Sequence, residues 1–432
     1  MSGLADILLD RGFRVSGSDI RETHITSHLR NKGAEIYIKQ SASNIKNPDV
    51  VVYSAAIKPD CEEYIAATEC GAVVIDRATL MGAIMKLYKY PIAVSGTHGK
   101  TTTTSMMSHI LLAADLDPTI SIGGELPAIG GNIRVGNSDF FLCEACEYHQ
   151  SFLRFFPLIS IVLNIEEDHL DYFRDLAHIK DTFRGLADLT PPQGALIINA
   201  DDANTTSAFE GVSAPLITCS KQKEADYQAL QITAAKNGCP TFTVLEYGKE
   251  LGTISLSVPG MHNVSNALCA IAAARFLGIS FNAIQKGLEA FTGVERRFER
   301  KGSKNGVDVI DDYAHHPTEI AATLKLASSL GYKNVYCIFQ PHTYTRTKTL
   351  FNDFVSVFKD VSPLILDIYA AREKDTGLVS SQDLVNAIPD ATYCSSFDAC
   401  IAFLRENAKN GDLILTVGAG DVFRVGELFL QD

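Results

Sequence analysis

Residues 92–102, with the sequence IAVSGTHGKTT, hold the pattern that decides the fold. The apolar segment at residues 92–95 predicts a buried strand, and a helical pattern follows at residues 101–114. The turn between them contains Gly96 and Gly99, which let the backbone come close to a ligand. Backbone N–H groups in such a turn converge on phosphate oxygens, and the helix N-terminus adds partial positive charge. A strand, a glycine-rich turn and a helix in this order predict an α/β domain that binds a nucleotide.

Two side chains of this turn suit a nucleoside triphosphate. Lys100 can place its ammonium group on the β- and γ-phosphates, and Thr101 can offer its hydroxyl group to Mg²⁺. The turn is two residues shorter than the Walker A pattern G-x-x-x-x-G-K-[ST], and the alternative interpretation is an ordinary βα turn. Its position between a strand and a helix favours the phosphate site. The predicted phosphate-binding residues are Gly96, Thr97, His98, Gly99, Lys100, Thr101 and Thr102.

The composition is that of a globular protein with about three domains. The chain has 432 residues, of which 46% are hydrophobic and 21% charged. Its formal net charge of −13 argues against a protein that binds duplex nucleic acid. No apolar run reaches the roughly 18 residues of a membrane span, and Asp6 and Asp10 argue against a secretory signal. Ten irregularly spaced cysteines indicate reduced thiols, so we expect a cytoplasmic protein without membrane or nucleic-acid partners.

Residues 1–89 alternate short apolar and helical segments, which predicts a Rossmann-like unit with a parallel sheet. A Rossmann unit normally opens with a strand and a glycine-rich turn, whereas this sequence opens directly on a helix. Helices are predicted at residues 2–10 and 61–68, strands at 13–15, 50–53 and 72–75, and a turn at 16–19.

Two further α/β units follow, at residues 90–297 and 298–432, and a charge-rich linker is predicted at residues 296–301. Within residues 229–256 the pattern changes to shorter strands with turns at Asn237-Gly238 and Tyr247-Gly248. Helices are predicted from His262 and from Ser280, and strands at residues 140–143, 158–164, 307–310, 334–339, 363–366 and 413–417.

Polar residues follow several of these strands. Glu144 comes directly after the strand at 140–143, and a carboxylate at this edge beside a phosphate loop suits Mg²⁺. The CxxC segment at residues 143–146 lacks a second pair of ligands, so no zinc site is predicted. Taken alone, the acidic segment NIEEDHLD, residues 164–171, would more often be a solvated turn. Its position after a strand, together with the phosphate loop, favours a functional site. The adjacent histidines of DDYAHHPTE, residues 311–319, are too polar for a core strand and also indicate a site.

The sequence GTHGKTTT resembles the short phosphate loop of the Mur ligase family, a loop form that folylpolyglutamate synthetases share. EACEYHQSFL, NIEEDHLD and DDYAHHPTE resemble the C-type branch of that family. Further matches at residues 367–373 and 418–421 extend the resemblance over essentially the whole chain. It implies an α/β protein of three domains: a Rossmann-like UDP-sugar domain at 1–89, a P-loop ATPase-like domain at 90–297 and a Rossmann-like closing domain at 298–432.

The resemblance implies an enzyme that uses ATP and Mg²⁺ to join L-alanine to UDP-N-acetylmuramate through an acyl phosphate. The product would be the UDP-N-acetylmuramoyl-L-alanine of peptidoglycan precursor synthesis, and the enzyme would be a monomer or a weak homodimer. One alternative is the branch of the same family that attaches a recycled tripeptide to this sugar nucleotide. Another is a nucleotide-sugar-binding protein with impaired catalysis. A folylpolyglutamate synthetase fits less well, because that family lacks DDYAHHP and a nucleotide-sugar domain of this type.

By the same resemblance, Thr101 and Glu144 hold one Mg²⁺ and His169 contributes to a second. Asn263, Asn266 and Arg297 are expected to contact ATP, and Asp312 its ribose. The implied catalytic residues are Lys100, Glu144, His169, His316 and Arg346. His316 could accept a proton from the alanine ammonium group, and Arg346 could bind the alanine carboxylate as a bidentate fork. The candidates for substrate binding are Ser18, Asp19, Ser54, Arg77, Gly123, Gly124, His315 and Arg346.

Sequences of the C-type branch typically begin with a strand and G-x-G-G-x-G-M-S-G. Met1, Ser2 and Gly3 match the end of that pattern. We therefore expect about twenty further residues, a strand plus its turn, to precede Met1 in the native protein. The alternative is a natural variant with weakened UDP binding, and the mass of the native protein would decide between the two.

Overall fold

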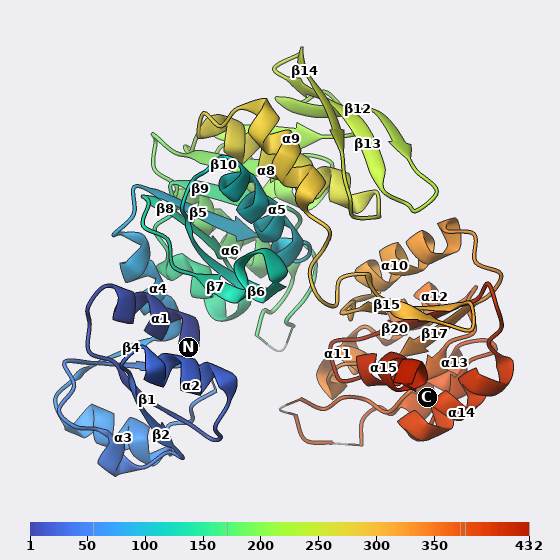
Figure 1. Cartoon of the computed structure of the whole chain (residues 1–432), viewed down its shortest axis with the longest axis horizontal. Helices are drawn as coiled ribbons and strands as arrows, with labels where there is room; N and C mark the ends of the chain where they lie inside the picture. Colours follow the sequence, from blue (N-terminus) through green and yellow to red (C-terminus); the bar gives the residue numbers. More distant parts are fainter. Residues whose placement is uncertain (55, 171, 372, 376, 432) are drawn as a thin grey trace.

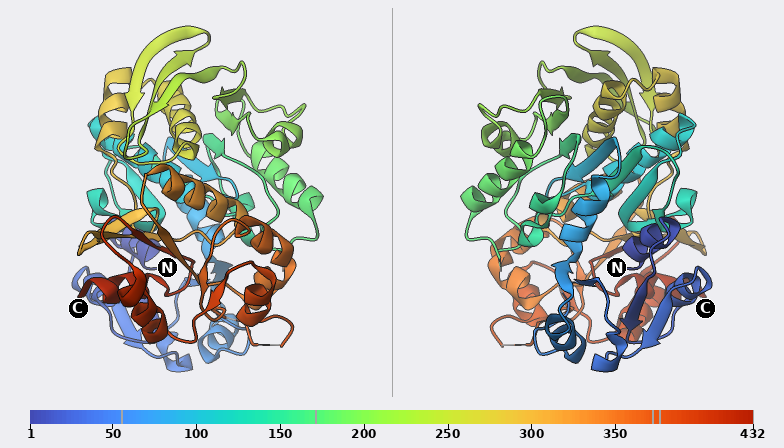
Figure 2. Two further views of the ribbon diagram at one scale, coloured as in Figure 1. Left: turned by 90° about the vertical axis from the view of Figure 1, so that its right-hand side faces the viewer. Right: turned by 90° about the vertical axis from the view of Figure 1, so that its left-hand side faces the viewer.

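The computed structural model describes every residue except Ala55, Asp171, Arg372, Thr376 and Asp432. Asp171 and Arg372, which belong to the predicted motifs, therefore lie outside the described residues. Figure 1 shows three α/β units in chain order, from the blue N-terminal unit through the central unit to the orange and red C-terminal unit. The N-terminal and C-terminal units both lie against one side of the central unit (Figures 1 and 2).

The N-terminal unit has two separate pairs of parallel strands flanked by helices. β1 pairs with β2, and β3 pairs with β4. Leu4 and Ile7 of the first helix share a core with Met81 and Met85 of α4 and with strands of the central unit, so these two helices anchor the N-terminal unit. Its elements are α1 (Ser2–Asp10), β1 (Ser16–Asp19), α2 (His24–Asn31), β2 (Glu35–Ile38), η1 (Ala42–Asn44), β3 (Val50–Tyr53), α3 (Glu62–Glu69), β4 (Val73–Asp76) and α4 (Arg77–Met85).

The first strand of the chain lies later than the sequence predicts. The prediction of a strand at residues 13–15 with a turn after it is wrong, because β1 occupies Ser16–Asp19. Phe13 is 58% exposed, and β1 instead pairs along its whole length with β2. Backbone pairing therefore outweighs the local strand preference of the apolar residues. The substrate candidates Ser18 and Asp19 consequently lie inside a strand.

The central unit is built on a ten-stranded sheet in which β5 lies between β9 and β8, all three parallel. Alternate residues of β5 enter different cores, as expected for a strand covered on both faces. Ile92 and Val94 pack with α5, α8 and α9, whereas Ala93 packs with α6 and the N-terminal helices. The elements are β5 (Tyr90–Ser95), α5 (Lys100–Ala113), β6 (Thr119–Leu126), η2 (Pro127–Ile129), β7 (Gly131–Arg134), β8 (Phe140–Glu144), η3 (Tyr148–Arg154), β9 (Ile159–Val162), α6 (Leu176–Asp188), β10 (Ala195–Asn199), α7 (Ala203–Ala208), β11 (Leu216–Ser220), β12 (Tyr227–Ala234), β13 (Pro240–Glu246), β14 (Lys249–Ser255), α8 (His262–Phe276) and α9 (Phe281–Ala290).

The C-terminal unit has a six-stranded sheet in the order β15-β16-β20-β17-β18-β19. The linker predicted at residues 296–301 is wrong in its second half, because β15 begins at Glu299 and pairs antiparallel with β16. β15 is an edge strand, so its charged side chains can reach solvent. The elements are β15 (Glu299–Lys304), β16 (Val307–Asp312), α10 (Pro317–Ser329), β17 (Val335–Phe339), α11 (Tyr344–Thr349), α12 (Phe351–Val357), β18 (Leu364–Ile365), α13 (Ser381–Ala387), β19 (Thr392–Tyr393), α14 (Phe397–Asn407), β20 (Leu413–Val417) and α15 (Phe423–Gln431).

The sheet topology places the predicted motifs at one location. β5, β8 and β9 are neighbouring parallel strands, so the phosphate loop, Glu144 and the segment after β9 share one edge of the central sheet. The start of α10 and the start of α11 face this edge from the C-terminal unit, as the contacts below show. Among the described residues, no helix combines the length and the apolar character needed to cross a membrane.

Candidate active site

The phosphate loop adopts a conformation that its glycines permit. Gly96 has a φ of +134° and Gly99 a φ of +82°, both in the region that favours glycine. A Cβ atom at Gly96 would lie 3.0 Å from the Cβ atom of Leu163. The amide of Asn164 fixes the loop, because its Oδ1 accepts the N–H of His98 at 2.7 Å and its Nδ2 donates to the carbonyl of His98 at 3.1 Å. The first turn of α5 therefore points into the site in a defined geometry.

Lys100 is held inside the loop by a buried carboxylate. Its Nζ donates to the carbonyl of Thr97 at 2.9 Å and to Oε2 of Glu147 at 3.0 Å. Burial alone would lower the pKa of Lys100, but the Glu147 carboxylate outweighs burial and raises it. Glu147, which lies three residues after Glu144 and is only 2% exposed, was not predicted from the sequence. Its sole sequence signal is a second acid directly behind the strand end.

Glu144 and Thr101 place side-chain oxygen atoms, which could bind a metal ion, side by side next to the loop. The hydroxyl of Thr101 donates to Oε2 of Glu144 at 3.2 Å, and the N–H of Gly123 donates to Oε1 at 2.7 Å. Burial raises the pKa of Glu144, so this carboxylate is one whose charge a cation would stabilise. Gly123 therefore contacts the carboxylate, and a Cβ atom at Gly124 would lie 3.1 Å from Cγ2 of Thr101. The two substrate candidates Gly123 and Gly124 thus border this pair.

His169 lies apart from that pair. Its φ of +53° is unusual for a residue other than glycine, and its ring lies 4.5 Å from the ring of Tyr148. Its Nε2 is 3.8 Å from a carboxylate oxygen of Asp168. Among the residues that the structure describes, no hydrogen bond or ion pair joins His169 to Thr101 or Glu144.

Arg346 crosses from the C-terminal unit to the central unit. Its Nη2 lies 2.8 Å and its Nε 3.3 Å from Oδ1 of Asp168, and its Nη1 lies 3.2 Å from Nδ1 of His342. Burial alone would raise the pKa of Asp168, but Arg346 and His169 outweigh burial and lower it. Asp168, a residue without a predicted role, therefore pairs with the guanidinium group that is predicted to bind a carboxylate substrate. Arg346 and Asp168 lie 178 residues apart in the sequence, so no local pattern could pair them.

A cavity lies between the phosphate loop, the start of α8 and the C-terminal unit. Seven of the residues predicted to bind ATP line it: His98, Gly99, Thr102, Asn263, Asn266, Arg297 and Asp312. The side chains of Asn263 and Asn266 are hydrogen-bonded, with Nδ2 of Asn266 donating to Oδ1 of Asn263 at 3.0 Å. Lys100 is paired with Glu147, and Thr101 is hydrogen-bonded to Glu144.

The start of α10 brings several titratable groups to this cavity. Burial raises the pKa of Asp312 to about 6, although Thr323 donates to its carboxylate at 2.7 Å. Burial lowers the pKa of His315 to about 4 and also lowers that of His316. Both histidines are therefore neutral near pH 7. Their backbone N–H groups donate to Oε2 of Glu319, an acid that was quoted in the motif but given no role.

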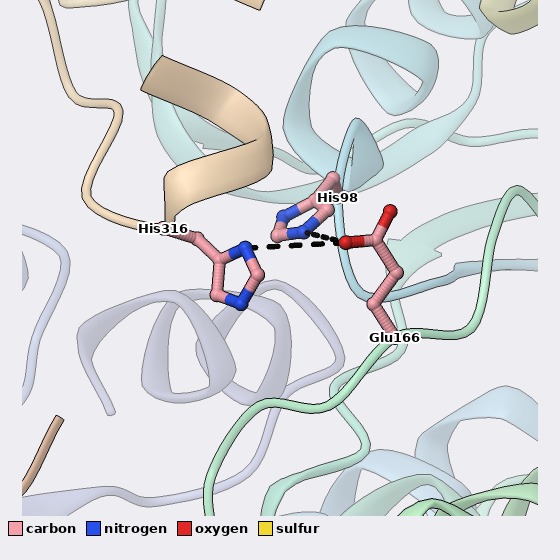
Figure 3. A group of neighbouring side chains, drawn as sticks. All are labelled: His98, Glu166 and His316. Atoms are coloured by element: carbon pink, nitrogen blue, oxygen red, sulfur yellow. Dashed lines mark ion pairs between the residues drawn. The ribbon is translucent and has the colours of Figure 1, made fainter. Parts of the chain in front are cut away.

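His98 connects the phosphate loop to α10. Its Nδ1 lies 3.0 Å from Oε1 of Glu319, and its Nε2 lies 3.5 Å from Oε2 of Glu166. Burial alone would lower the pKa of His98, but the two carboxylates outweigh it and raise the pKa to about 10. Figure 3 shows His98 and Glu166 together with His316 of the C-terminal unit. Arg297 also reaches Glu319, with Nη1 3.9 Å from its Oε1.

The candidates in the N-terminal unit are not brought into the same cluster. Ser18 donates to Glu63 at 2.6 Å within its own unit, and Asp19 accepts a long 3.4 Å bond from the N–H of Arg21. Ser54 follows β3 directly. Arg77, the first residue of α4, is near enough to the Met1 ammonium group to help lower its pKa, although burial contributes more. Among the described residues, no hydrogen bond or ion pair joins Ser18, Asp19, Ser54 or Arg77 to the phosphate loop.

A phosphate loop at a sheet edge, with carboxylates beside it and side chains of the C-terminal unit facing it, is an arrangement suited to an enzyme that uses a nucleotide. Residues 1–89 match the catalytic domain of the Mur ligase family, residues 94–274 the Mur ligase middle domain, and residues 296–420 the Mur ligase glutamate ligase domain. The chain belongs to the Mur ligase family.

The chain is similar over its whole length to individual ligases of this family. The chain is 53% identical to the UDP-N-acetylmuramate–L-alanine ligase of Acetivibrio thermocellus, over 100% of this chain and 93% of the relative. Among solved structures, it is similar to a UDP-N-acetylmuramate–alanine ligase from Thermotoga maritima, with a TM-score of 0.80 and 28% identity over 100% of this chain and 96% of that one. A murein peptide ligase from Psychrobacter arcticus has a TM-score of 0.71 and 26% identity, over 100% of this chain and 95% of that one.

Proposed function

We propose that this enzyme joins L-alanine to UDP-N-acetylmuramate at the expense of ATP. The observation that carries the proposal is the arrangement of Lys100, Thr101 and Glu144 at the sheet edge opposite His316 and Arg346 of the C-terminal unit. The relative from Acetivibrio thermocellus supports the substrate assignment, because it is 53% identical over the whole chain and carries this ligase name.

The proposed chemistry has two steps. In the first, a carboxylate oxygen of UDP-N-acetylmuramate attacks the γ-phosphorus of ATP, so that a C–O–P linkage forms and ADP leaves. In the second, the amine nitrogen of alanine attacks the carbonyl carbon, the amide bond forms and inorganic phosphate leaves. The protein contributes mainly by positioning the reactants and by neutralising charge, as is usual for phosphoryl transfer.

Lys100 and the loop backbone are assigned to the phosphates of ATP. Without nucleotide, the Lys100 ammonium group is paired with Glu147 and stays charged, so it is already oriented within the loop. Asn263, Asn266, Arg297 and Asp312 line the adjoining cavity and are assigned to the remainder of the nucleotide.

Thr101 and Glu144 fit a magnesium ion. They present oxygen ligands, which Mg²⁺ prefers, and the half-buried Glu144 carboxylate, whose pKa is raised, is one whose charge a cation would stabilise. A magnesium ion bound there would neutralise negative charge on the β- and γ-phosphates. Within the described part of the chain, no hydrogen bond or ion pair joins His169 to this pair, and its assignment to a second magnesium ion stays a prediction.

The C-terminal unit is assigned to the amino acid. Arg346 can bind the alanine carboxylate once it releases Asp168, because both are carboxylates competing for one guanidinium group. His316 is buried and neutral beside the half-buried His315, and it is assigned to accept the proton that the alanine ammonium group must lose.

The experiment that tests this function is phosphate release from ATP with Mg²⁺ and UDP-N-acetylmuramate, with and without L-alanine. We expect release that depends on alanine, and a loss of at least about a hundredfold in Lys100→Ala, the scale reported for removing one group that stabilises a transition state. Release that requires neither alanine nor the sugar nucleotide would contradict the proposal.

The tripeptide-recycling reaction is the second candidate, favoured by the similarity to the Psychrobacter arcticus murein peptide ligase. The same assay with the tripeptide in place of alanine separates the two. Turnover with the tripeptide and not with alanine would assign the recycling reaction. Turnover with alanine alone would assign the synthetic one.

A further inference from the structure

Three side chains outside the Thr101–Glu144 pair converge on one point between the central and C-terminal units. His98 comes from the phosphate loop, Glu166 from the segment after β9 and His316 from the start of α10 (Figure 3). One ligand atom from each lies within 4.8 Å of the others. Among the residues that the structure describes, this is the one group of three His, Cys, Asp or Glu side chains with such spacing.

The spacing is close to that of a tetrahedral metal centre. Oε2 of Glu166 lies 3.5 Å from Nε2 of His98 and 3.9 Å from Nδ1 of His316. Ligand atoms bonded to Zn²⁺ at 2.0–2.1 Å lie about 3.4 Å apart. The Glu166 oxygen therefore lies within about 0.5 Å of this spacing from each histidine nitrogen, and the two nitrogens lie within 4.8 Å of each other.

The remaining ring nitrogen of each histidine is already engaged in the way that metal-bound histidines require. Nδ1 of His98 lies 3.0 Å from the carboxylate of Glu319, and Nε2 of His316 lies 3.1 Å from the carbonyl of Glu167. Both partners are acceptors, so each histidine donates from the nitrogen that faces away from the cluster. A carboxylate or carbonyl acceptor of this kind fixes the tautomer and raises the basicity of the ligand nitrogen.

One nitrogen of the cluster has a carboxylate neighbour but no hydrogen bond. Nε2 of His98 is buried and, among the described residues, makes no hydrogen bond. Oε2 of Glu166 accepts the Thr318 hydroxyl at 2.6 Å, which leaves a lone pair for a cation. Nδ1 of His316 accepts only a long bond of 3.3 Å from the N–H of Thr318, which a metal–nitrogen bond could replace. A buried nitrogen that makes no hydrogen bond and lies 3.5 Å from a carboxylate oxygen is a position where a cation could bind both atoms.

We propose that His98, Glu166 and His316 bind a late first-row divalent cation such as Zn²⁺, and that this cation ties the C-terminal unit to the phosphate loop. Two imidazoles and one carboxylate match the catalytic-type zinc set of three protein ligands, which leaves a fourth position for water or a phosphate oxygen. The preference for nitrogen ligands separates this site from the oxygen-only Thr101–Glu144 pair, which suits Mg²⁺.

The test is a titration of the full-length, metal-free protein with Co²⁺, whose visible absorption reports a four- or five-coordinate nitrogen–oxygen site. We expect saturation at one equivalent, displacement by Zn²⁺, and no displacement by an excess of Mg²⁺. Affinity should fall at least tenfold in His316→Gln and Glu166→Gln, and about tenfold in Glu319→Gln, which loses the carboxylate behind His98 and alters the acceptor of the His315 and His316 N–H groups.

Two control variants test whether the loss of Co²⁺ binding is specific to the three proposed ligands. Glu144→Gln removes the oxygen pair assigned to Mg²⁺, and His24→Gln removes one exposed histidine of the N-terminal unit. Both should bind Co²⁺ like the unaltered protein. Circular dichroism of each variant checks folding, and anomalous diffraction from Zn²⁺-soaked crystals should place a peak at bonding distance from the three ligand atoms.

Three results would overturn the proposal. The first is the absence of a saturable visible band in the unaltered protein. The second is a band that survives both His316→Gln and Glu166→Gln or disappears in Glu144→Gln. The third is a thiolate-to-cobalt charge-transfer band, which would assign binding to cysteines, since the ten cysteines are free.

Discussion

At the scale of single residues, the ion pair Lys100–Glu147 should stabilise the ligand-free protein. Both side chains are largely buried, and removing one partner of a buried ion pair typically costs about 3 kcal/mol. Glu147→Gln should therefore lower the melting temperature of the ligand-free protein by about 5–10 °C. The deficit should shrink when a non-hydrolysable ATP analogue and Mg²⁺ are added, because phosphate oxygens then pair with Lys100.

The control for this prediction is Glu69→Gln, which alters an exposed acid at the end of α3 and should leave the melting temperature within about a degree. Calorimetry with and without the analogue measures both effects. A deficit for Glu147→Gln that the analogue does not reduce would mean that the phosphates do not reach Lys100.

Gly96 offers a second test at this scale. An alanine there would need a φ of +134°, and its Cβ atom would lie 3.0–3.2 Å from Leu163 and Asn164. We expect Gly96→Ala to cost about 1–3 kcal/mol and to weaken nucleotide binding, measured by thermal melting and by calorimetric titration. Gly17→Ala is the matched control, since its surroundings are open and its φ is ordinary. Equal behaviour of the two variants would contradict a strained phosphate loop.

At the scale of elements, the contact between the phosphate loop and α10 should depend on pH through His98. The pKa of His98 is about 10 in the folded protein against an ordinary 6.5. A raised pKa means that the stabilisation is complete below pH 6.5 and is lost as the pH rises through 10. The difference in melting temperature between the unaltered protein and His98→Gln should therefore be largest near pH 6.5 and smallest above pH 10. His24→Gln, at an exposed position, serves as the control. A difference that stays constant over this range would show that the carboxylates do not hold the charged imidazole.

Elements whose signals are local could be predicted from the sequence. The strand at Val50–Tyr53 and that at Leu413–Val417 have the predicted bounds, and α1 spans the predicted residues 2–10. β1 could not be placed, because its four residues carry no apolar pattern and only the pairing with β2 defines the strand. β15 was missed for the same reason, since an edge strand can carry the charges of a linker.

The residues of the candidate site likewise fall into those that local motifs predict and those that only distant contacts reveal. Motif residues that follow strands, such as Lys100 and Glu144, lie together because parallel strands end at one sheet edge. Glu147, Asp168 and Glu319 gain their importance from contacts 47 to 221 residues distant in sequence, which no local spacing reveals. The individual roles of the motif residues stay predictions until the variants above are measured.

At the scale of the whole molecule, the ion pair between Arg346 and Asp168 couples domain position to substrate binding. The pair joins the C-terminal unit to the central unit at 2.8 Å, and it holds the guanidinium group assigned to alanine. Asp168→Asn should therefore loosen the ligand-free protein, and its radius of gyration in small-angle X-ray scattering should increase. The pKa of Asp168 is lowered in the folded protein, so the pair contributes fully above the ordinary aspartate pKa and is lost as the pH falls below it.

The control is Asp308→Asn, which breaks the pair Arg300–Asp308 within the C-terminal unit and should leave the radius of gyration unchanged.

Asp168→Asn also removes a competitor for Arg346, so the KM for alanine should fall. Arg346→Ala should raise the KM for alanine by about a hundredfold, the scale of a lost charge-assisted hydrogen-bond pair. A raised KM in Asp168→Asn would mean that Asp168 positions Arg346 for the amino acid. An unchanged radius of gyration in that variant would mean that other contacts, His98–Glu319 foremost, hold the two units together.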